Sequence, residues 1–319
     1  MLRHLIAATC AAFWMLPCQA QTWPERSVKM IVPFPAGGPL DVTARLLAER
    51  LAENLKQPFV IENRAGVAGN VGTEAVAKAA PDGYTLLVGL DTPVTVNPAL
   101  YNKLTFNPDT DLAPMSIIAS FTQMLVIHPS VDANSLAEFV ALTKRNSLTY
   151  GSGGARGNPG HLTMEALRLL AGFQLVHVTY KGNPQVVADL VGGHIQAGFL
   201  ASPSVIELVK DGKLRALAVS GKHRERAAPN VPTVAESGYA DFDISFYQVM
   251  LAPAGLSETV RERIEREVQR VVKSADFQAR LVAQGLTPIG SNGAEAADWL
   301  KAAARHWKAV IETSNIRPE

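Results

Sequence analysis

The sequence predicts an α/β fold in which mainly parallel sheets are flanked by helices. Short apolar runs rich in β-branched residues alternate with amphipathic helical stretches along most of the chain. A strand, a glycine-rich turn and a helix follow one another at residues 28–46, and the same order returns at residues 148–170. Because alternating strands and helices build parallel sheets, we expect ligands at the carboxyl ends of the strands.

The composition is that of a globular chain, long enough for two domains or for one large α/β domain. Of the 319 residues, 47% are apolar and 18% are charged, which supplies material for a full core. The basic and acidic side chains number 30 and 29. This balance offers no strongly basic face, so the sequence predicts no nucleic-acid partner.

Residues 1–20 have the organisation of a cleavable secretory signal peptide. Arg3 precedes an apolar run at residues 5–16, and small residues follow up to Ala20, where we expect cleavage. The run is too short to span a bilayer, and no later stretch offers the roughly 20 apolar residues that a transmembrane helix needs. We therefore expect a periplasmic mature protein that begins at Gln21.

Both cysteines, Cys10 and Cys18, lie in this leader. Its removal leaves no thiol, disulfide or cysteine-based metal site, and 29 basic side chains against 29 acidic ones because Arg3 is lost. A lipid anchor on Cys18 is the competing interpretation. Pro17 disfavours it, because a small flexible residue is wanted at that position.

The turn after the first predicted strand is the first candidate for a ligand site. The strand covers residues 28–32, and a helix opens near Leu40. Glycines without a Cβ let backbone N–H groups and the positive end of a helix approach a carboxylate or phosphate. A tight connection without any ligand explains the same residues, and the stretch alone leaves both interpretations open. The candidates are Phe34, Pro35, Ala36, Gly37, Gly38 and Asp41.

The following elements complete a βαβαβ unit. They are the helix to residue 55, a strand at 59–62, a loop at 63–70, a helix at 71–80, a Pro-Asp-Gly turn at 81–83 and a strand at 84–90. This order places Asp91 and Thr92 on the same edge of the sheet as Gly37 and Gly38.

The second unit repeats the plan after a crossing strand at residues 117–128. A helix at 135–144 and a strand at 148–151 lead into a second glycine-rich loop. Asn158 is a good N-cap for a helix that Pro159 opens, and Gly172 closes that helix. The candidate site residues here are Ser152, Gly153, Gly154, Arg156, Asn158 and His161.

The remaining elements bring further candidates to strand ends. A strand at 174–180 ends at Tyr180, and a strand at 195–200 ends at Ala201 and Ser202, where Ser202 caps the next helix. The rest of the chain is a helix opened by Pro184, a strand at 214–220, a polar connection at 221–238, a helix capped by Ser257, and a helix at 296–311 behind a capping box of Asn292 and Glu295.

Several catalytic and cofactor motifs are absent. A dinucleotide fingerprint would need glycine where Arg156 stands, and no phosphate-binding P-loop motif occurs. Ser152 is no nucleophile elbow, because Tyr150 occupies the position two residues before it. No histidine pair has metal-ligand spacing. The sequence thus predicts no catalytic residue, no metal and no cofactor.

Seven segments together resemble the Bug-type extracytoplasmic receptors of tripartite tricarboxylate transporters. In order along the chain, they are PFPAGGPLDVTARLLAERL, VIENRAGVAGNVGTEAVAKAAPDGYTLLVG, NPALY, YGSGGARGNPGHLTMEAL, VTYKGNPQVVADLVGGHIQAGF, LRALAVSGKHR and VPTVAESGY. The resemblance covers nearly the whole mature chain.

The resemblance implies a two-lobed periplasmic binding protein, a type II-like clamshell with a hinged cleft and no catalysis. It implies a monomer that delivers a small carboxylate, which is a di- or tricarboxylate, an amino acid or an aromatic acid, to transporter membrane subunits. In this family, the loops matching residues 34–38 and 152–158 hold the carboxylate through backbone amides and ordered waters. We expect one lobe at 21–121 with 243–319 and the other at 122–242.

The chain departs from the family pattern at two places. Asp91, Thr92 and Pro93 replace a Ser/Thr-rich stretch, and residues 246–248, Phe-Tyr-Gln, stand near a usual Trp-Gly. Asp91 either selects an amine-bearing ligand or caps its own turn. A receptor that presents its ligand to a sensor kinase and a periplasmic enzyme on the same fold are the alternative functions.

Overall fold

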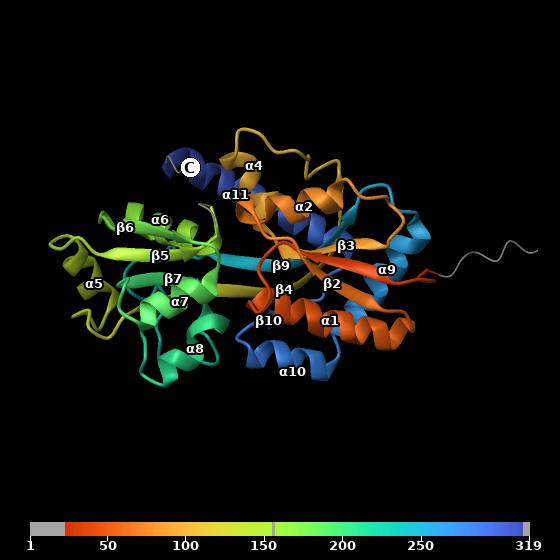
Figure 1. Cartoon of the computed structure of the whole chain (residues 1–319). Helices are drawn as coiled ribbons and strands as arrows, with labels where there is room; N and C mark the ends of the chain where they lie inside the picture. Colours follow the sequence, from red (N-terminus) through yellow and green to blue (C-terminus); the bar gives the residue numbers. More distant parts are fainter. Residues whose placement is uncertain (1–22, 155–156, 315–319) are drawn as a thin grey trace, which may run out of the picture.

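The computed structural model describes residues 23–154 and 157–314, which form two lobes side by side (Figure 1). Within these residues, no helix combines the length and the apolar composition that crossing a membrane requires. The leader predicted at residues 1–20 lies outside the described residues.

The first lobe is built on three parallel strands. The central strand β1 pairs with β2 on one side and with β3 on the other. Leu47, Leu51 and Leu55 of α1 are buried against this sheet. The elements are β1 (Val28–Val32), α1 (Pro39–Leu55), β2 (Phe59–Asn63), η2 (Val67–Gly69), α2 (Asn70–Ala77), β3 (Thr85–Leu90), α3 (Thr92–Thr95) and α4 (Asn97–Leu100).

The second lobe repeats the parallel arrangement around β5. This strand pairs with β6 and with β7. Asn158 caps α6, and Gly172 ends it in the left-handed conformation, as predicted. The elements are α5 (Leu136–Thr143), β5 (Thr149–Gly153), α6 (Pro159–Ala171), β6 (Val176–Tyr180), α7 (Asn183–Val191), β7 (Ala197–Ala201), α8 (Ser202–Lys210) and β8 (Arg215–Val219).

Two long antiparallel strands join the lobes, and they run through the middle of Figure 1. The strand β4 (Leu112–Ile127) pairs with β9 (Ser245–Pro253) over residues 112–122, and then with β7 and β8 over residues 123–127. The resulting order is β2-β1-β3-β9-β4-β7-β5-β6. The parallel strands of the two lobes are therefore linked through the antiparallel strands β9 and β4.

The tail of the chain returns to the first lobe. The capping box is present, because Asn292 Oδ1 accepts from Glu295 N–H at 2.8 Å and Glu295 Oε2 accepts from Asn292 N–H at 2.9 Å. Trp307 of the last helix stacks on Phe246 of β9, with ring centroids 5.5 Å apart. The elements are α9 (Glu258–Val272), α10 (Ala275–Ala283), β10 (Thr287–Pro288) and α11 (Gly293–Ser314).

Candidate ligand-binding site

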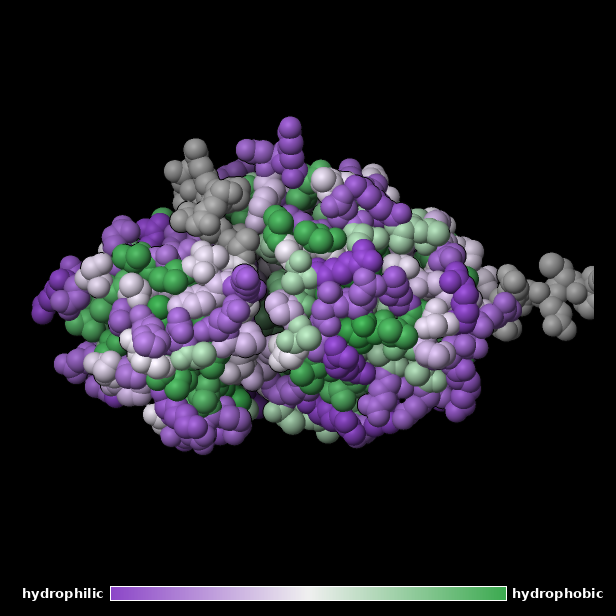
Figure 2. Space-filling view, viewed as in Figure 1, coloured by the Kyte–Doolittle hydropathy of each residue, from purple (hydrophilic) through white to green (hydrophobic). Residues whose placement is uncertain are grey.

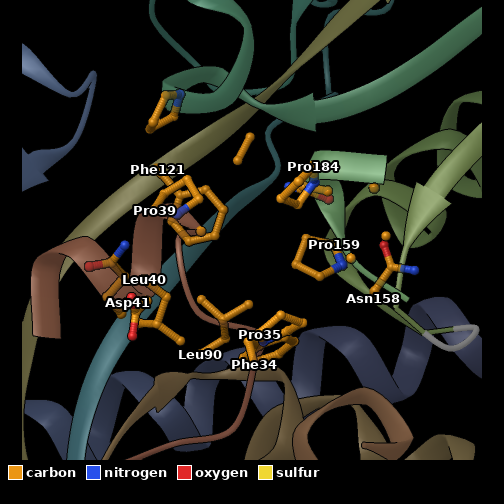
Figure 3. A pocket seen from close by; sticks show the side chains of 18 of the residues that line it. Phe34, Pro35, Pro39, Leu40, Asp41, Leu90, Phe121, Asn158, Pro159 and Pro184 are labelled. Carbon is orange, nitrogen blue, oxygen red and sulfur yellow. The ribbon is translucent and has the colours of Figure 1, made fainter. Parts of the chain in front are cut away.

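A cavity lies between the two lobes, where the surface is hollowed into a crevice (Figure 2). It contains about 730 Å³ of empty space, including the part open to solvent. Leu40 and Asp41 lie on one side of it, and Pro159 and Pro184 lie on the other (Figure 3). The lining residues are Phe34, Pro35, Gly38, Pro39, Leu40, Asp41, Leu90, Phe121, Gln123, Gly153, Asn158, Pro159, Gly160, Gly182, Asn183, Pro184, Ala201, Pro203, Gln248 and Leu286.

Four helices begin at this cavity. The helices α1, α6, α7 and α8 each carry a proline in their first turn, and all four prolines line the cavity. Their positive ends therefore converge on one space, which favours an anion. Proline has no N–H group, so the donors available to a ligand belong to neighbouring residues.

The first glycine-rich turn is held by Asp41. Its carboxylate accepts from Gly37 N–H at 3.0 Å, from Asn63 Nδ2 at 2.9 Å and from Arg45 Nε at 2.9 Å. Burial opposes ionisation, but these hydrogen bonds and the Arg45 charge outweigh it and lower the pKa of Asp41. In this structure Asp41 therefore occupies the Gly37 N–H group, and the expected role of Gly37 as a ligand donor stays a prediction.

The donors left in the first lobe lie one residue further on. Among the described residues, no protein acceptor bonds the N–H groups of Gly38, Leu40 or Asp41, which belong to the cap and first turn of α1. All three residues line the cavity. The start of α1 can thus offer backbone donors without a cationic side chain.

Asn158 organises the start of α6. Its Oδ1 accepts from His161 N–H at 3.2 Å, and its Nδ2 donates to Ser152 Oγ at 2.9 Å. Ser152 Oγ also lies 2.7 Å from His177 Nε2, while His161 Nδ1 accepts from Gly157 N–H at 3.1 Å. His161 therefore faces the loop ahead of it. Neither Ser152 nor His161 lines the cavity, and both are buried.

The Ser152–His177 pair has the spacing of a nucleophile and its base, but it is enclosed by protein. Ser152 has no exposed surface, and its hydroxyl is shared with the Asn158 amide. A nucleophile must reach the reacting atom of a substrate. The pair therefore supports the loop and offers no site for acyl transfer.

The two glycines after Ser152 serve close packing. Gly154 N–H donates to Tyr180 O at 2.7 Å, so this group is occupied within the protein, and its expected role as a ligand donor also stays a prediction. A Cβ on Gly153 would lie 2.3 Å from the backbone N of Asn183. Gly153 ends β5 and does not sit in the predicted loop, and it lets the start of α7 approach this strand.

Tyr180 and Ser202 bond within the protein. Tyr180 Oη donates to Asp189 Oδ2 at 2.7 Å, and burial together with Asp189 raises the pKa of Tyr180 to about 12. Ser202 was expected to cap α8, but it is the first helical residue and its hydroxyl donates to Thr122 O at 3.3 Å. Of the three candidates Tyr180, Ala201 and Ser202, only Ala201 lines the cavity.

Asp91 does not reach the cavity, which corrects the expectation that it shares the rim with the glycines. Its Oδ1 accepts from Tyr247 N–H at 3.1 Å, and its own N–H donates to Tyr247 O at 3.0 Å. The side chain is fully buried, and burial raises its pKa to about 7. Asp91 thus ties β3 to β9, while Leu90 before it lines the cavity.

The predicted site residues divide into two groups. The cavity is lined by Phe34, Pro35, Gly38, Asp41, Gly153, Asn158 and Ala201. It is not lined by Ala36, Gly37, Asp91, Thr92, Ser152, Gly154, His161, Tyr180 or Ser202. Arg156 lies outside the described residues.

The sequence prediction missed two kinds of lining residue. Gly182 and Asn183 precede Pro184 just as Asn158 precedes Pro159, so the same cap-and-proline pattern was present to find them. Gln123 and Gln248 lie inside the strands β4 and β9, where no local signal distinguishes a cavity residue from a core residue.

The lining of the cavity is suited to binding an anion. Among its described lining residues there is no Lys, Arg or His, and the single acid, Asp41, is already paired with Arg45. Apolar side chains and helix starts make up most of its wall. Such a site holds an anion by backbone dipoles and surrounds its apolar part.

Two lobes, two connecting strands and a cavity between them define a solute-binding receptor. The chain belongs to the family described as the tripartite tricarboxylate transporter family receptor, whose model matches residues 43–316.

Relatives and solved structures agree with this assignment. The chain is 34% identical over 303 residues to protein BugT of Bordetella pertussis, with 94% of this chain and 93% of that protein covered. A protein of R. palustris solved with adipate has a TM-score of 0.89 and 30% identity, covering 93% of this chain and all of that one. MatC from Rhodopseudomonas palustris, solved with bound malate, has a TM-score of 0.85 and 27% identity, covering 91% of this chain and all of MatC.

Proposed function

We propose that this protein captures a small carboxylate in the cleft between its lobes and delivers it to the membrane subunits of a tripartite transporter. In this proposal, residues 21–121 with 243–319 form one lobe and residues 122–242 the other. The adipate and malate complexes of relatives support a carboxylate ligand. The observation that carries the proposal is the meeting of four helix starts in a cavity without a free cation among its described residues.

A thermal-shift screen tests the ligand class. The mature protein is heated with mono-, di- and tricarboxylates, amino acids and aromatic acids, and hits are confirmed by calorimetry. A ligand that binds only the folded state adds about 2.7 kcal/mol of stability at a hundred times its Kd, so a true ligand raises Tm clearly. The absence of any shift across the whole set would refute carboxylate capture.

The manner of holding the anion has a test of its own. A Cβ on Gly38 meets only Pro35 O, at 3.7 Å, so Gly38→Val is expected to fold and to obstruct the start of α1. It should nearly abolish binding, whereas Arg156→Ala should cost about 1–2 kcal/mol, the scale of one partly exposed charged hydrogen bond. Binding that survives Gly38→Val and is eliminated by Arg156→Ala alone would show a guanidinium clamp instead.

The proposed location follows from the predicted leader. Intact-mass analysis of the protein from the periplasmic fraction should find a chain that begins at Gln21. A mature form that keeps a lipidated Cys18 would contradict a cleaved, freely diffusing receptor.

A further inference from the structure

We propose that the cleft is polarised, so that Gln248, with Gln123 beside the same cavity, reads a neutral polar group at the far end of the ligand. The selected class is a monocarboxylate with a terminal hydroxyl or carboxamide, in preference to a dicarboxylate. This inference rests on the proposed function and specifies its substrate class.

The first observation is an amide without a partner. Gln248 is 1% exposed and lines the cavity, and no described residue bonds its buried Oε1. Leaving a buried polar atom unsatisfied is unfavourable, so a ligand atom is the partner expected there.

The second observation is the position of both glutamines on the connecting strands. Gln248 pairs with Leu90 of β3, and Gln123 pairs with Ala201 of β7. Gln123 is 2% exposed, and its side-chain amide makes no hydrogen bond to a described residue. An amide both donates and accepts, which matches a hydroxyl or a carboxamide. The apolar Leu90, Phe121 and Leu286 of the same wall suit the methylene chain between the two ends of the ligand.

The third observation is the distribution of charge. The starts of α6 and α7 in the second lobe line the cavity with Gly160 and Asn183, and no described acid lines that side. On the side of the first lobe, Asp41 lines the cavity, and its carboxylate is buried and bonded to Gly37, Asn63 and Arg45. The helix starts therefore favour one ligand carboxylate, and the described lining residues offer no free cation to hold a second one beside the glutamines.

Calorimetry with three six-carbon probes tests the proposal. The probes are 6-hydroxyhexanoate, adipate and hexanoate, which share a chain length and differ only at the far end. The wild type should bind the hydroxy acid about tenfold or more tighter than either of the others, the discrimination that one satisfied hydrogen bond provides. Four- and five-carbon sets of the same three end groups repeat the comparison.

The variant Gln248→Leu removes the amide and keeps the volume. It should weaken binding of the hydroxy acid to the level of hexanoate and leave hexanoate unchanged, while the exposed Gln278→Leu serves as the control and should alter nothing. The wild-type ranking decides the matter even if Gln248→Leu fails to fold.

Adipate that binds as tightly as the hydroxy acid, with Gln248→Leu leaving the ranking unchanged, overturns this inference and leaves carboxylate capture standing. Failure of every probe at every chain length, together with a flat thermal-shift screen, overturns both.

Discussion

At the scale of single residues, Asp91 joins β3 to β9 with a carboxylate that has no cation beside it among the described residues. One oxygen accepts from Tyr247 N–H, and the other has no hydrogen-bond partner in this part of the chain. Burial dominates and raises the pKa of Asp91 from 3.8 to about 7. The carboxyl is therefore protonated in the folded protein over a range of pH in which the unfolded chain ionises it.

Replacing Asp91 by Asn should remove the pH dependence of folding stability that this carboxyl causes. Between pH 4 and 7 the unfolded state releases a proton that the folded state keeps, so wild-type stability falls by up to about 1.4 kcal/mol per pH unit as pH rises. Asn keeps the acceptor for Tyr247 N–H. The Tm of Asp91→Asn relative to wild type should therefore rise between pH 4.5 and 7.5. A difference in Tm between Asp91→Asn and wild type that stays the same at every pH would contradict the view that Asp91 causes the fall in wild-type stability with rising pH.

Asp41→Asn is the matched control, with the opposite sign. The pKa of Asp41 is lowered, so its carboxylate stabilises the fold above pH 3.8, and that contribution is lost as pH falls through the lowered pKa. The variant should be less stable than wild type at pH 7, and the difference should shrink in acid. Thermal denaturation across pH measures both variants together.

Residue roles that depend on local geometry were predictable, and those that depend on distant partners were not. Asn158 was predicted to cap α6 because its partner, His161 N–H, is three residues away. Asp91 takes its donor from Tyr247, 156 residues later in the chain. No pattern around residue 91 distinguishes that contact from a turn cap or a ligand contact, so the sequence left its role open.

At the scale of elements, a strained turn supports the first binding loop. Gly66, Val67, Ala68 and Gly69 all have positive φ, at 147°, 46°, 51° and 90°. A Cβ on Gly69 would lie 3.4 Å from the Phe34 ring, so this turn packs directly beneath the loop. Val67 is 51% exposed, and a β-branched residue at such a φ is disfavoured by about 1–2 kcal/mol.

Val67→Gly should leave stability unchanged or raise it by up to about 1 kcal/mol, because glycine relieves the strain and costs part of that gain in unfolded-state entropy. Val71→Gly is the matched control. It removes an equally exposed valine from α2, where glycine should destabilise by roughly 0.5–1 kcal/mol. Chemical denaturation of both variants gives the comparison. A loss of stability in Val67→Gly as large as in Val71→Gly would show that the turn holds no strain.

Among the elements, the parallel units were predictable from alternating patterns, and the strand β9 was not. β1 and β5 are each followed within a few residues by a glycine-rich turn and a helix that begins at a proline. β9 pairs with β3 and β4, more than a hundred residues earlier in the chain. Its apolar run fits a core segment as well as a strand, and only the return of the chain between the lobes decides between them.

At the scale of the whole molecule, the lobes approach each other around the cavity. A Cβ on Gly182 of the second lobe would lie 3.4 Å from Pro35 Cγ of the first, and one on Gly285 of the first lobe would lie 3.7 Å from Pro203 N of the second. The connecting strands β4 and β9 run between the lobes. The two near approaches narrow the crevice, and we expect the lobes to separate about these strands when a ligand enters or leaves.

Small-angle scattering should show a smaller radius of gyration with the tightest ligand of the calorimetry panel than without ligand. Gly182→Leu should prevent much of this compaction, because Gly182 has an extended φ of −174° that leucine adopts, and the larger side chain then pushes against Pro35. The exposed Lys181→Leu, one residue earlier, controls for added apolar volume and should compact like wild type. Each variant is measured at ten or more times its own Kd, so that weaker binding by Gly182→Leu is not mistaken for failed closure. Identical wild-type profiles with and without ligand would mean that the receptor stays closed when empty, and the ligand would then have to enter through local movement of the 34–38 turn.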